Sequence, residues 1–289
     1  EHLTIRFNKF VGSLKSLEGL SNLKSLSLRG TVYLTTANHC DIDRENLKFI
    51  LGLKKLESLE VSGCKMDSDT IGDLGQLPNL RELNISGNSN SDSLRVLSQL
   101  KKLKRLSLIG GKVRDISPLR GLSQLEVLFI GNNSIEDLSP LSALKKLRVV
   151  ELGRNPYSSI EALKKLRNIE KLGMKDCNVT DFEFIKNWKK LKALDTKGCN
   201  LTTKQKQFVA SLSLPEKSIQ KSTGEEAQFL EPIYRRRHAW QSMGDAHHGF
   251  KGLFLDDYFF EIGAGFGGTR LEIPGESIIQ LKYLHFDFS

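Results

Sequence analysis

A hydrophobic pattern recurs along the first two thirds of the chain. Its clearest copy is the stretch from Leu125 to Leu141, in which leucine and isoleucine alternate with polar residues and then recur at wider spacing. The pattern repeats every 22 residues, with copies beginning at Leu103, Leu125, Leu147, Ile169 and Leu191. Looser copies begin at Leu23, Leu56 and Leu80, and an incomplete one contains Leu3 and Ile5. A fixed period of this length predicts a solenoid of nine strand segments, in which no unit buries its apolar side alone.

Each repeat is expected to begin with a short strand. Because side chains alternate across a strand, Leu128 and Ile130 are predicted to point inward, and Val127, Phe129 and Gly131 outward. The later apolar residues of the repeat must also point inward to share the same core; they are Leu125, Ile135, Leu138, Leu141 and Leu144. Burial of each side chain contributes about 1.5–3 kcal/mol, most of which the loss of chain entropy offsets.

An Asn or Cys closes most of the strand motifs. Asn occupies this position at 88, 133 and 155, and Cys at 64, 177 and 199. Where the chain leaves the strand, its peptide groups lose their partners, and an Asn amide can donate to them and accept from them. Thr31 and Gly111 depart from the pattern, so we expect weaker hydrogen bonding there.

The motif L-x-x-L-x-L-x-x-N/C resembles the leucine-rich-repeat family. The 22-residue step, with Asp115-Ile-Ser-Pro-Leu119 and Asp137-Leu-Ser-Pro-Leu141, looks like the internalin-type bacterial subfamily, and the resemblance covers roughly residues 1–201. It implies an α/β fold, namely a right-handed leucine-rich-repeat solenoid with a curved parallel sheet and short helices or turns on the convex side. It also implies binding to other proteins, and no chemistry.

The sequence predicts three regions. Residues 1–212 are the solenoid with a C-terminal cap helix, because Thr202-Thr-Lys-Gln205 has a capping-box pattern. Residues 213–228 are a polar linker, and residues 229–289 are a small β-rich module. Within the module, 252–262 and 269–273 are expected to be strands joined by a Gly-rich turn, with another strand in 278–288.

An insertion interrupts the second repeat. The strand starts on either side of it are 33 residues apart, and most of the extra length lies in residues 32–46. The stretch from Asp43 to Leu51 predicts a capped helix on the outer side. The loop before it, with Tyr33, His39 and Cys40, either flanks a binding surface or pads the edge.

Composition places the chain among ordinary globular proteins. Of its 289 residues, 39% are hydrophobic and 27% charged, and no apolar run approaches the roughly 20 residues that span a bilayer. No signal peptide is visible, although the chain begins at Glu1 inside a repeat, so a leader or further repeats ahead of it stay open. Three of the four cysteines fill the repeat position, so we expect reduced thiols and a cytoplasmic protein.

The net charge of +9 is unevenly placed. Residues 201–289 carry 10 Lys/Arg and 11 Asp/Glu, which leaves 33 against 23, or +10, for residues 1–200. Paired lysines precede every second strand: Lys54-Lys55, Lys101-Lys102, Lys145-Lys146 and Lys189-Lys190. Parallel strands are about 4.8 Å apart, so the pairs recur about every 10 Å along one edge. This edge either keeps the protein soluble or steers an acidic protein or a nucleic acid; the last is disfavoured because no series of aromatic residues accompanies the lysines.

The outward strand positions define a candidate binding face. Ile109, Val127, Phe129 and Val149 are expected to cluster across three successive repeats, with charged residues around them. The predicted partner-binding residues are Arg105, Ile109, Val127, Phe129, Val149, Glu151, Lys171, Lys175, Asp195 and Lys197. An apolar centre with a charged rim is typical of a protein interface. Two alternatives stay open: scattered exposed hydrophobes, or coverage by the chain's own C-terminal region.

Three features of the C-terminal module resemble enzymatic sites. Gly263-Ala-Gly-Phe-Gly-Gly268 matches G-x-G-x-x-G, but the following residues predict a strand rather than the helix that a dinucleotide fold requires. Possible metal ligands lack a recognised spacing: His238, Asp245, His247, His248, Asp256 and Asp257. Arg235-Arg-Arg237 is more typical of a solvated turn than of an anion site. We therefore predict no catalytic residue, no metal and no cofactor.

The sequence favours a non-enzymatic binding module that grips one protein partner on its concave face. A specific form of this hypothesis, based on analogy, is an immunity (antitoxin) protein that occludes a toxin. The alternative is a toxin, effector or enzyme in which the repeats recognise a target and residues 229–289 act. No membrane, small-molecule substrate or nucleic acid is expected as a partner.

Overall fold

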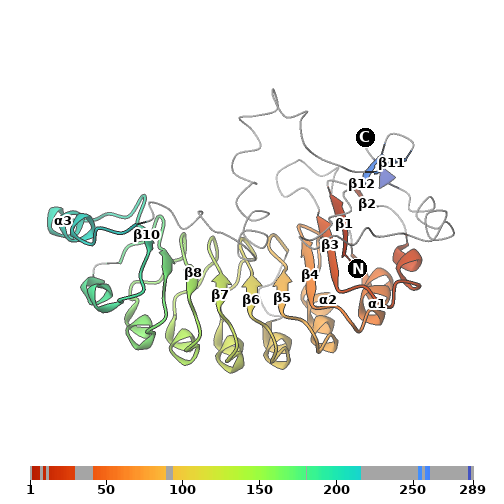
Figure 1. Cartoon of the computed structure of the whole chain (residues 1–289), viewed down its shortest axis with the longest axis horizontal. Helices are drawn as coiled ribbons and strands as arrows, with labels where there is room; N and C mark the ends of the chain where they lie inside the picture. The colour runs from red at the N-terminus through yellow and green to blue at the C-terminus, as the bar shows by residue number, and fades with distance from the viewer. Residues whose placement is uncertain are drawn as a thin grey trace.

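Nine parallel strands form one open sheet in the computed structural model of the chain (Figure 1). The structure describes residues 2–6, 9–10, 13–29, 42–88, 94–179 and 181–215, and three short strands beyond them. The sheet has the order β1-β3-β4-β5-β6-β7-β8-β9-β10, as predicted from the repeats. Its strands are β1 His2–Arg6, β3 Ser25–Arg29, β4 Ser58–Ser62, β5 Glu82–Asn84, β6 Arg105–Ser107, β7 Val127–Phe129, β8 Val149–Glu151, β9 Lys171–Gly173 and β10 Ala193–Asp195.

The strand register stacks equivalent repeat positions on one another. Leu106 pairs with Leu128, Leu128 with Val150, and Val150 with Leu172, and all four side chains are fully buried. The predicted inward phase is therefore confirmed. A slip of one residue would turn these side chains to the other face of the sheet, so burial fixes the register.

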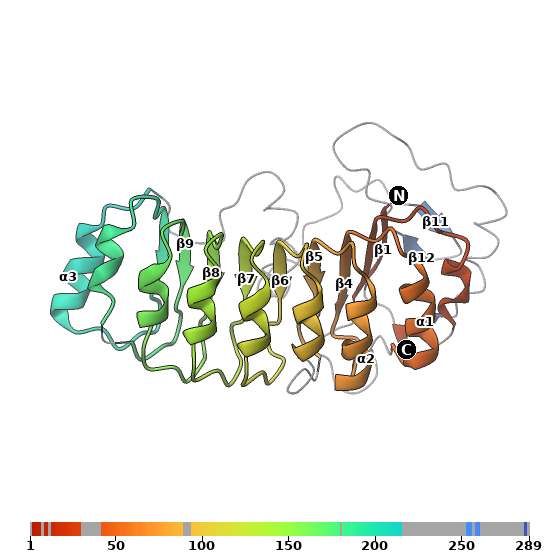
Figure 2. The same cartoon turned by 90° about the horizontal axis from the view of Figure 1, so that it is seen from below.

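Helical turns line the opposite side of each repeat (Figure 2). Three are α-helices: α1 Arg44–Gly52, α2 Ser68–Asp73 and α3 Thr203–Ser211. The others in the described residues are short 3₁₀ helices: η1 Leu14–Leu17, η2 Leu74–Gln76, η3 Leu94–Gln99, η4 Ser117–Gly121, η5 Ser139–Ala143, η6 Glu161–Lys165 and η7 Glu183–Asn187. A 22-residue repeat leaves room for one short turn, and a proline at the start of η4 and of η5 favours its φ angle.

The predicted asparagine ladder is present. Asn133 Oδ1 accepts from the Gly111 and Val113 amides at 2.9 and 3.0 Å, and its Nδ2 donates to the Leu108 and Ile130 carbonyls at 2.9 and 3.0 Å. One side chain thus joins two consecutive repeats through their backbones. Asn88 and Asn155 make equivalent bonds in their own repeats.

Two predicted helices are present in the structure. At the C-terminal end, α3 begins with the predicted capping box: Thr202 Oγ1 accepts from the Gln205 amide at 3.3 Å, and Gln205 Oε1 accepts from the Thr202 amide at 2.8 Å. Phe208 of this helix packs on Phe182, with ring centroids 5.9 Å apart. The helix predicted from Asp43 is also confirmed, as α1 with Asp43 as its N-cap.

Three short strands of the C-terminal region are described. The expected single strand at 252–262 is instead a pair of antiparallel strands, β11 Leu253–Leu255 and β12 Tyr258–Phe260. Asp256 and Asp257 separate them, and aspartate favours turns over strands. β13 Phe286–Asp287, within the expected strand at 278–288, pairs antiparallel with β2 Lys9–Phe10.

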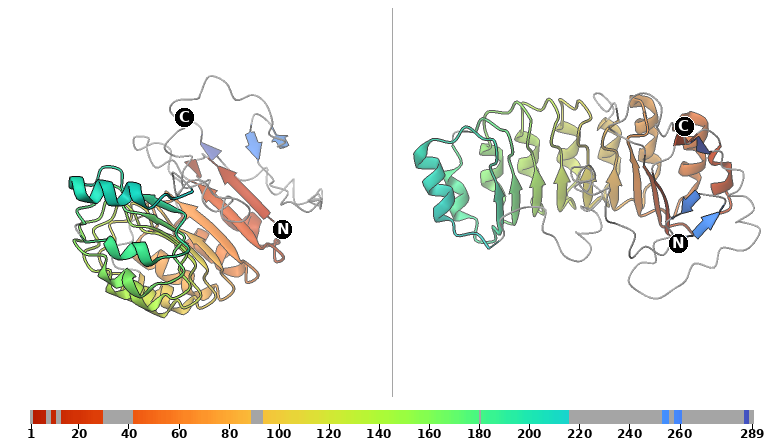
Figure 3. Two further views of the ribbon diagram at one scale, coloured as in Figure 1. Left: turned by 60° about the vertical axis from the view of Figure 1, so that its left-hand side comes forward. Right: turned by 90° about the horizontal axis from the view of Figure 1, so that it is seen from above.

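These strands lie at the N-terminal end of the sheet, near β1 (Figure 3). Several expectations fall outside the described residues: the linker beyond Pro215, the rest of the 229–289 module with its Gly-rich, histidine and arginine segments, and the loop that contains Tyr33, His39, Cys40 and Thr31.

Candidate partner-binding face

The predicted binding residues lie on β6–β10 and in the turns directly after them. Val127, Phe129 and Val149, with half-buried Ile109, form a cluster that is separate from the solenoid core. They therefore sit on the concave face, which is the face of the sheet away from the helical turns. We call these four residues the apolar cluster. Their predicted outward orientation is confirmed.

Three members of the apolar cluster point outward but are buried, so the alternative of scattered exposed hydrophobes is wrong for them. Only 2% of Val127, 0% of Phe129 and 1% of Val149 is exposed. Strand pairing accounts for part of this cover, because Val127 pairs with Val149, and Phe129 lies between Ser107 and Glu151. Phe129 also takes part in a further contact. A partner that reaches the ring must displace something that already touches it.

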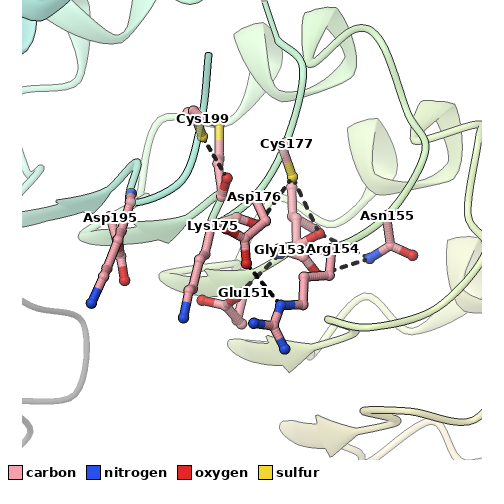
Figure 4. Close-up of polar contacts among 12 residues, drawn as sticks. Glu151, Gly153, Arg154, Asn155, Lys175, Asp176, Cys177, Asp195 and Cys199 are labelled. Carbon is pink, nitrogen blue, oxygen red and sulfur yellow. Dashed lines mark hydrogen bonds and ion pairs between the residues drawn. The ribbon is translucent and has the colours of Figure 1, made fainter. Parts of the chain in front are cut away.

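The charged residues expected around the cluster differ in accessibility. Lys171 is buried, with 5% exposed, whereas Lys197 is exposed. Arg105 is paired with Glu82. Glu151 Oε1 accepts from the Gly153 amide at 3.1 Å (Figure 4). Lys175 and Asp195 are half-buried, and Asp195 Oδ1 accepts from the Lys197 amide at 3.0 Å. The open part of the predicted site is therefore its C-terminal end.

A polar network fills the N-terminal half of the concave face. Glu60 accepts from Ser27 Oγ at 2.8 Å, from Asn84 Nδ2 at 3.0 Å and from Ser62 Oγ at 3.3 Å, and is 9% exposed. Ser86 and Ser107 share a 2.7 Å hydrogen bond further along. This network was not predicted from the sequence; its available signal was the recurrence of Ser, Asn and Glu at equivalent strand positions.

A row of charges that the sequence analysis missed marks the strand starts. This strand-start row contains Glu57, Arg81, Lys104, Glu126, Arg148, Glu170 and Lys192. Neighbours of opposite sign pair across repeats: Arg81 with Glu57 at 3.1 Å, Arg148 with Glu170 at 2.6 Å and Lys192 with Glu170 at 2.7 Å. Hydrogen bonds from Arg148 and Lys192 and their positive charges lower the pKa of Glu170 to about 2, against the effect of its burial. The sequence signal for this row was that acidic and basic residues occupy the same position, just before the strand, in successive repeats.

The cysteines of the described repeats are free thiols at Cys64, Cys177 and Cys199, as expected for ladder residues. Cys177 Sγ lies 2.8 Å from the Tyr157 hydroxyl, and Cys199 Sγ donates to the Met174 carbonyl at 2.9 Å. Burial raises the pKa of both Cys177 and Cys199. Both thiols therefore stay protonated at neutral pH, which makes them poor nucleophiles.

The part of the chain that the structure describes has no group of three or more His, Cys, Asp or Glu side chains that could hold a metal ion. Likewise, none of the helices in the described segments is long and apolar enough to cross a membrane.

Comparison with known proteins places the repeats in a family. The family model described as "Leucine Rich repeats (2 copies)" matches residues 123–165. Internalin C2 of Listeria monocytogenes is 26% identical with a TM-score of 0.53, over 60% of this chain and 74% of that one. A leucine-rich-repeat protein of Leptospira interrogans is 22% identical with a TM-score of 0.54, over 71% of this chain and 62% of its own length. No curated protein sequence gives a match.

A plant receptor shares the fold at lower identity. The leucine-rich-repeat ectodomain of the Arabidopsis thaliana membrane receptor kinase GASSHO1/SCHENGEN3 is 19% identical with a TM-score of 0.50, over 69% of this chain and 24% of that one. Its structure was solved in complex with CASPARIAN STRIP INTEGRITY FACTOR 2.

These findings identify the class of protein. The described repeats form a leucine-rich-repeat solenoid, a fold that generally serves protein–protein interaction. These 22-residue repeats are similar to those of the bacterial internalin C2.

Proposed function

We propose that this protein binds one protein partner on the C-terminal half of its concave face. The observation that carries the proposal is the apolar cluster, which lies outside the solenoid core. The core is already closed by Leu106, Leu128 and Val150, so the fold does not need a phenylalanine and two valines on the other side of the sheet. Val127, Phe129 and Val149 are already buried in the free chain, so a partner would bind this cluster by taking the place of the contact that covers it.

The charged residues at the C-terminal end give such a partner its first contact. Lys197 is exposed and Lys175 and Asp195 are half-buried, so they can be reached before the contact at Phe129 is displaced. Exposed charges around an apolar centre mainly set the rate and register of association, while the apolar centre sets the rate of dissociation. The plant receptor, solved with a bound partner, supports a protein or peptide ligand for this fold.

The test is affinity capture from the source cells with matched variants of the full chain. Lys197→Glu changes the open end of the face, and Phe129→Ser changes its centre. Lys186→Glu, on the exposed side of η7, is the matched control for charge. Circular dichroism melts first establish that each variant is folded.

A protein retained by the wild type and by the Lys186 variant, but reduced about tenfold or more by both concave-face variants, supports the proposal. Equal retention by all four proteins contradicts it. So does loss with Lys186→Glu alone, because the convex side would then carry the binding.

We further propose an immunity function within this class, in which the concave face occludes the working surface of a toxin. The proposal is supported by the shape of solenoid proteins, because an extended concave surface can cover a large area of one partner. Purified protein should inhibit the captured partner's activity at a one-to-one ratio, and Phe129→Ser should abolish inhibition. A captured partner that remains fully active would contradict the immunity function while leaving binding intact.

A cytoplasmic location is proposed from the thiols. Three free cysteines in the described repeats fit a reducing compartment. Labelling of denatured protein from freshly lysed source cells should find these thiols reduced, in the cytoplasmic fraction. Recovery from the extracellular medium would contradict this.

A further inference from the structure

The eight paired lysines form one positively charged edge of the solenoid. This lysine edge consists of Lys54, Lys55, Lys101, Lys102, Lys145, Lys146, Lys189 and Lys190, and all eight side chains are exposed. Each pair stands just before a strand of a parallel sheet, namely β4, β6, β8 and β10, so the pairs follow one another along a single side. With strands about 4.8 Å apart, the row extends for roughly 30 Å.

Neutral amides, not carboxylates, hold the second lysine of every pair. Lys55 Nζ donates to Asn22 Oδ1 and Lys102 Nζ to Asn79 Oδ1, each at 2.7 Å. Lys146 Nζ donates to Gln124 Oε1 at 2.6 Å, and Lys190 Nζ to Asn168 Oδ1 at 2.7 Å. The intervening repeats thus supply an acceptor at the same position each time. An amide fixes the ammonium group and occupies one of its three protons, but it leaves the charge uncompensated.

The acidic residues nearest in sequence are already engaged. Glu57, Glu126 and Glu170 of the strand-start row pair with arginines and lysines of that same row. Within the described part of the chain, no ion pair forms between a carboxylate and any of the eight lysines under a 4.0 Å limit. The edge therefore presents eight unneutralised positive charges in a line.

The composition of the lysine edge argues against a protein partner there. The residues that flank the pairs are buried, including Leu56, Leu103, Leu147 and Trp188, so the row offers no apolar anchor. Protein interfaces are depleted of lysine and depend on a desolvated apolar centre. A surface of lysines alone fits a ligand that is itself strongly hydrated and charged along its length.

The spacing also argues against nucleic acid. A nucleic-acid strand carries one charge about every 3.4 Å, so pairs of lysines that recur about every 10 Å would leave about one phosphate in three without a partner. Single-stranded nucleic acids also need aromatic platforms for their bases, and none is exposed among the flanking residues. A polymer with more widely spaced charges and no bases matches the row better.

We propose that the lysine edge binds a linear acidic polysaccharide, with sulfate, phosphate or carboxylate groups on its sugars meeting successive lysine pairs. This site is separate from the concave face and does not depend on the function proposed for it. Such polymers lie outside the cytoplasm, so recovery of the protein from the extracellular medium, which would contradict the cytoplasmic location, would agree with this site. The ammonium group suits such a ligand because it is a compact charge on a flexible stem, without the fixed fork of an arginine.

The test measures binding of the full chain to three labelled probes by fluorescence anisotropy, from low salt to physiological salt. The probes are a hyaluronan oligosaccharide, which carries one carboxylate per disaccharide, oligo-dT and poly-glutamate of similar total charge. The edge variant is Lys55→Gln/Lys102→Gln/Lys146→Gln/Lys190→Gln. The control variant removes the same charge from scattered exposed lysines, as Lys48→Gln/Lys112→Gln/Lys186→Gln/Lys206→Gln.

The hyaluronan probe should bind tightest although it has the lowest charge density, and the edge variant should weaken its Kd about tenfold or more and lower the salt dependence by about half. The control variant should change the Kd by less than about twofold. If both variants raised the Kd equally, binding would depend only on the net charge of the protein, and the lysine edge would not be a specific site. Tighter binding of oligo-dT or poly-glutamate would overturn the ligand class, and no measurable binding at physiological salt would overturn the proposal.

Discussion

Single side chains that bridge two repeats carry much of the specificity of this fold. Asn155 is such a residue: its Oδ1 accepts from the Ile135 amide at 3.1 Å, and its Nδ2 donates to the Ile130 and Leu152 carbonyls at 2.9 and 2.8 Å. It is 7% exposed, so water cannot replace these bonds. The side chain acts as a backbone substitute where the strand ladder ends.

Replacement of Asn155 by alanine should therefore lower the free energy of unfolding by roughly 2–4 kcal/mol, because several buried backbone groups lose their partner. Urea denaturation followed by circular dichroism measures this loss. Asn178→Ala is the control, since Asn178 is exposed and its contact is a single 3.3 Å bond from Asn200. A similar loss in both variants would show that the ladder position has no special weight.

For single residues, the sequence predicted the direction in which a side chain points better than its exposure to solvent. The alternation around Leu128 fixed the outward direction of Phe129, because a one-residue slip would have exposed two core residues. Coverage of the cluster was only one of the alternatives left open by the sequence, since burial depends on what lies against the concave face and not on strand phase. The same holds for Lys171, which the pattern places outward and the structure buries.

The charge row at the strand starts acts between elements, joining β8, β9 and β10. Glu170 is its best-defined member, with a side chain 13% exposed between Arg148 and Lys192. Its pKa is lowered from 4.5 to about 2, first by the Arg148 hydrogen bond. The folded pKa lies below the unfolded one, so the stabilisation is complete above pH 4.5 and is lost as the pH falls towards 2.

Glu170→Gln should destabilise the protein by about 1–3 kcal/mol at pH 7, discounted for the exposure of both partners. The difference from the wild type should shrink as the pH falls below 4.5 and vanish near 2. Urea midpoints of both proteins across this range provide the measurement, with Glu183→Gln at an exposed pair as control. A gap between wild type and variant that stays constant with pH would contradict the assignment.

The elements of the solenoid were predictable because each repeats one local pattern. The same alternation of apolar and polar residues occurs in nine strand segments, so each copy supports the prediction of the others. The Asp-x-Ser-Pro segments predict the turns at η4 and η5. The hairpin of β11 and β12 was not foreseen because the segment is apolar at both ends, and only Asp256-Asp257 signalled the break.

At the scale of the whole molecule, the chain is a stack in which each repeat contacts mainly its neighbours. The pairing of β13 with β2 joins the two ends of the sequence and lies outside that pattern. Sequence could not predict it, because two-residue strands separated by nearly the full chain leave no periodic signal. The C-terminal end of the stack, by contrast, is closed locally by α3 and its contact with Phe182.

Because each repeat contacts mainly its neighbours, a solenoid with one destabilised end should unfold from that end first. Phe208→Ala removes the ring of α3 that packs on Phe182 and should cost about 1–2 kcal/mol, because Phe208 is only partly buried. Native-state hydrogen exchange should then show faster exchange in β10 and β9 and unchanged protection in β6 and β7. Gln207→Ala, on the exposed side of the same helix, should leave all four strands unchanged. If protection fell equally across the sheet, the repeats would unfold as a single unit, and local closure by α3 would not explain the stability of this end.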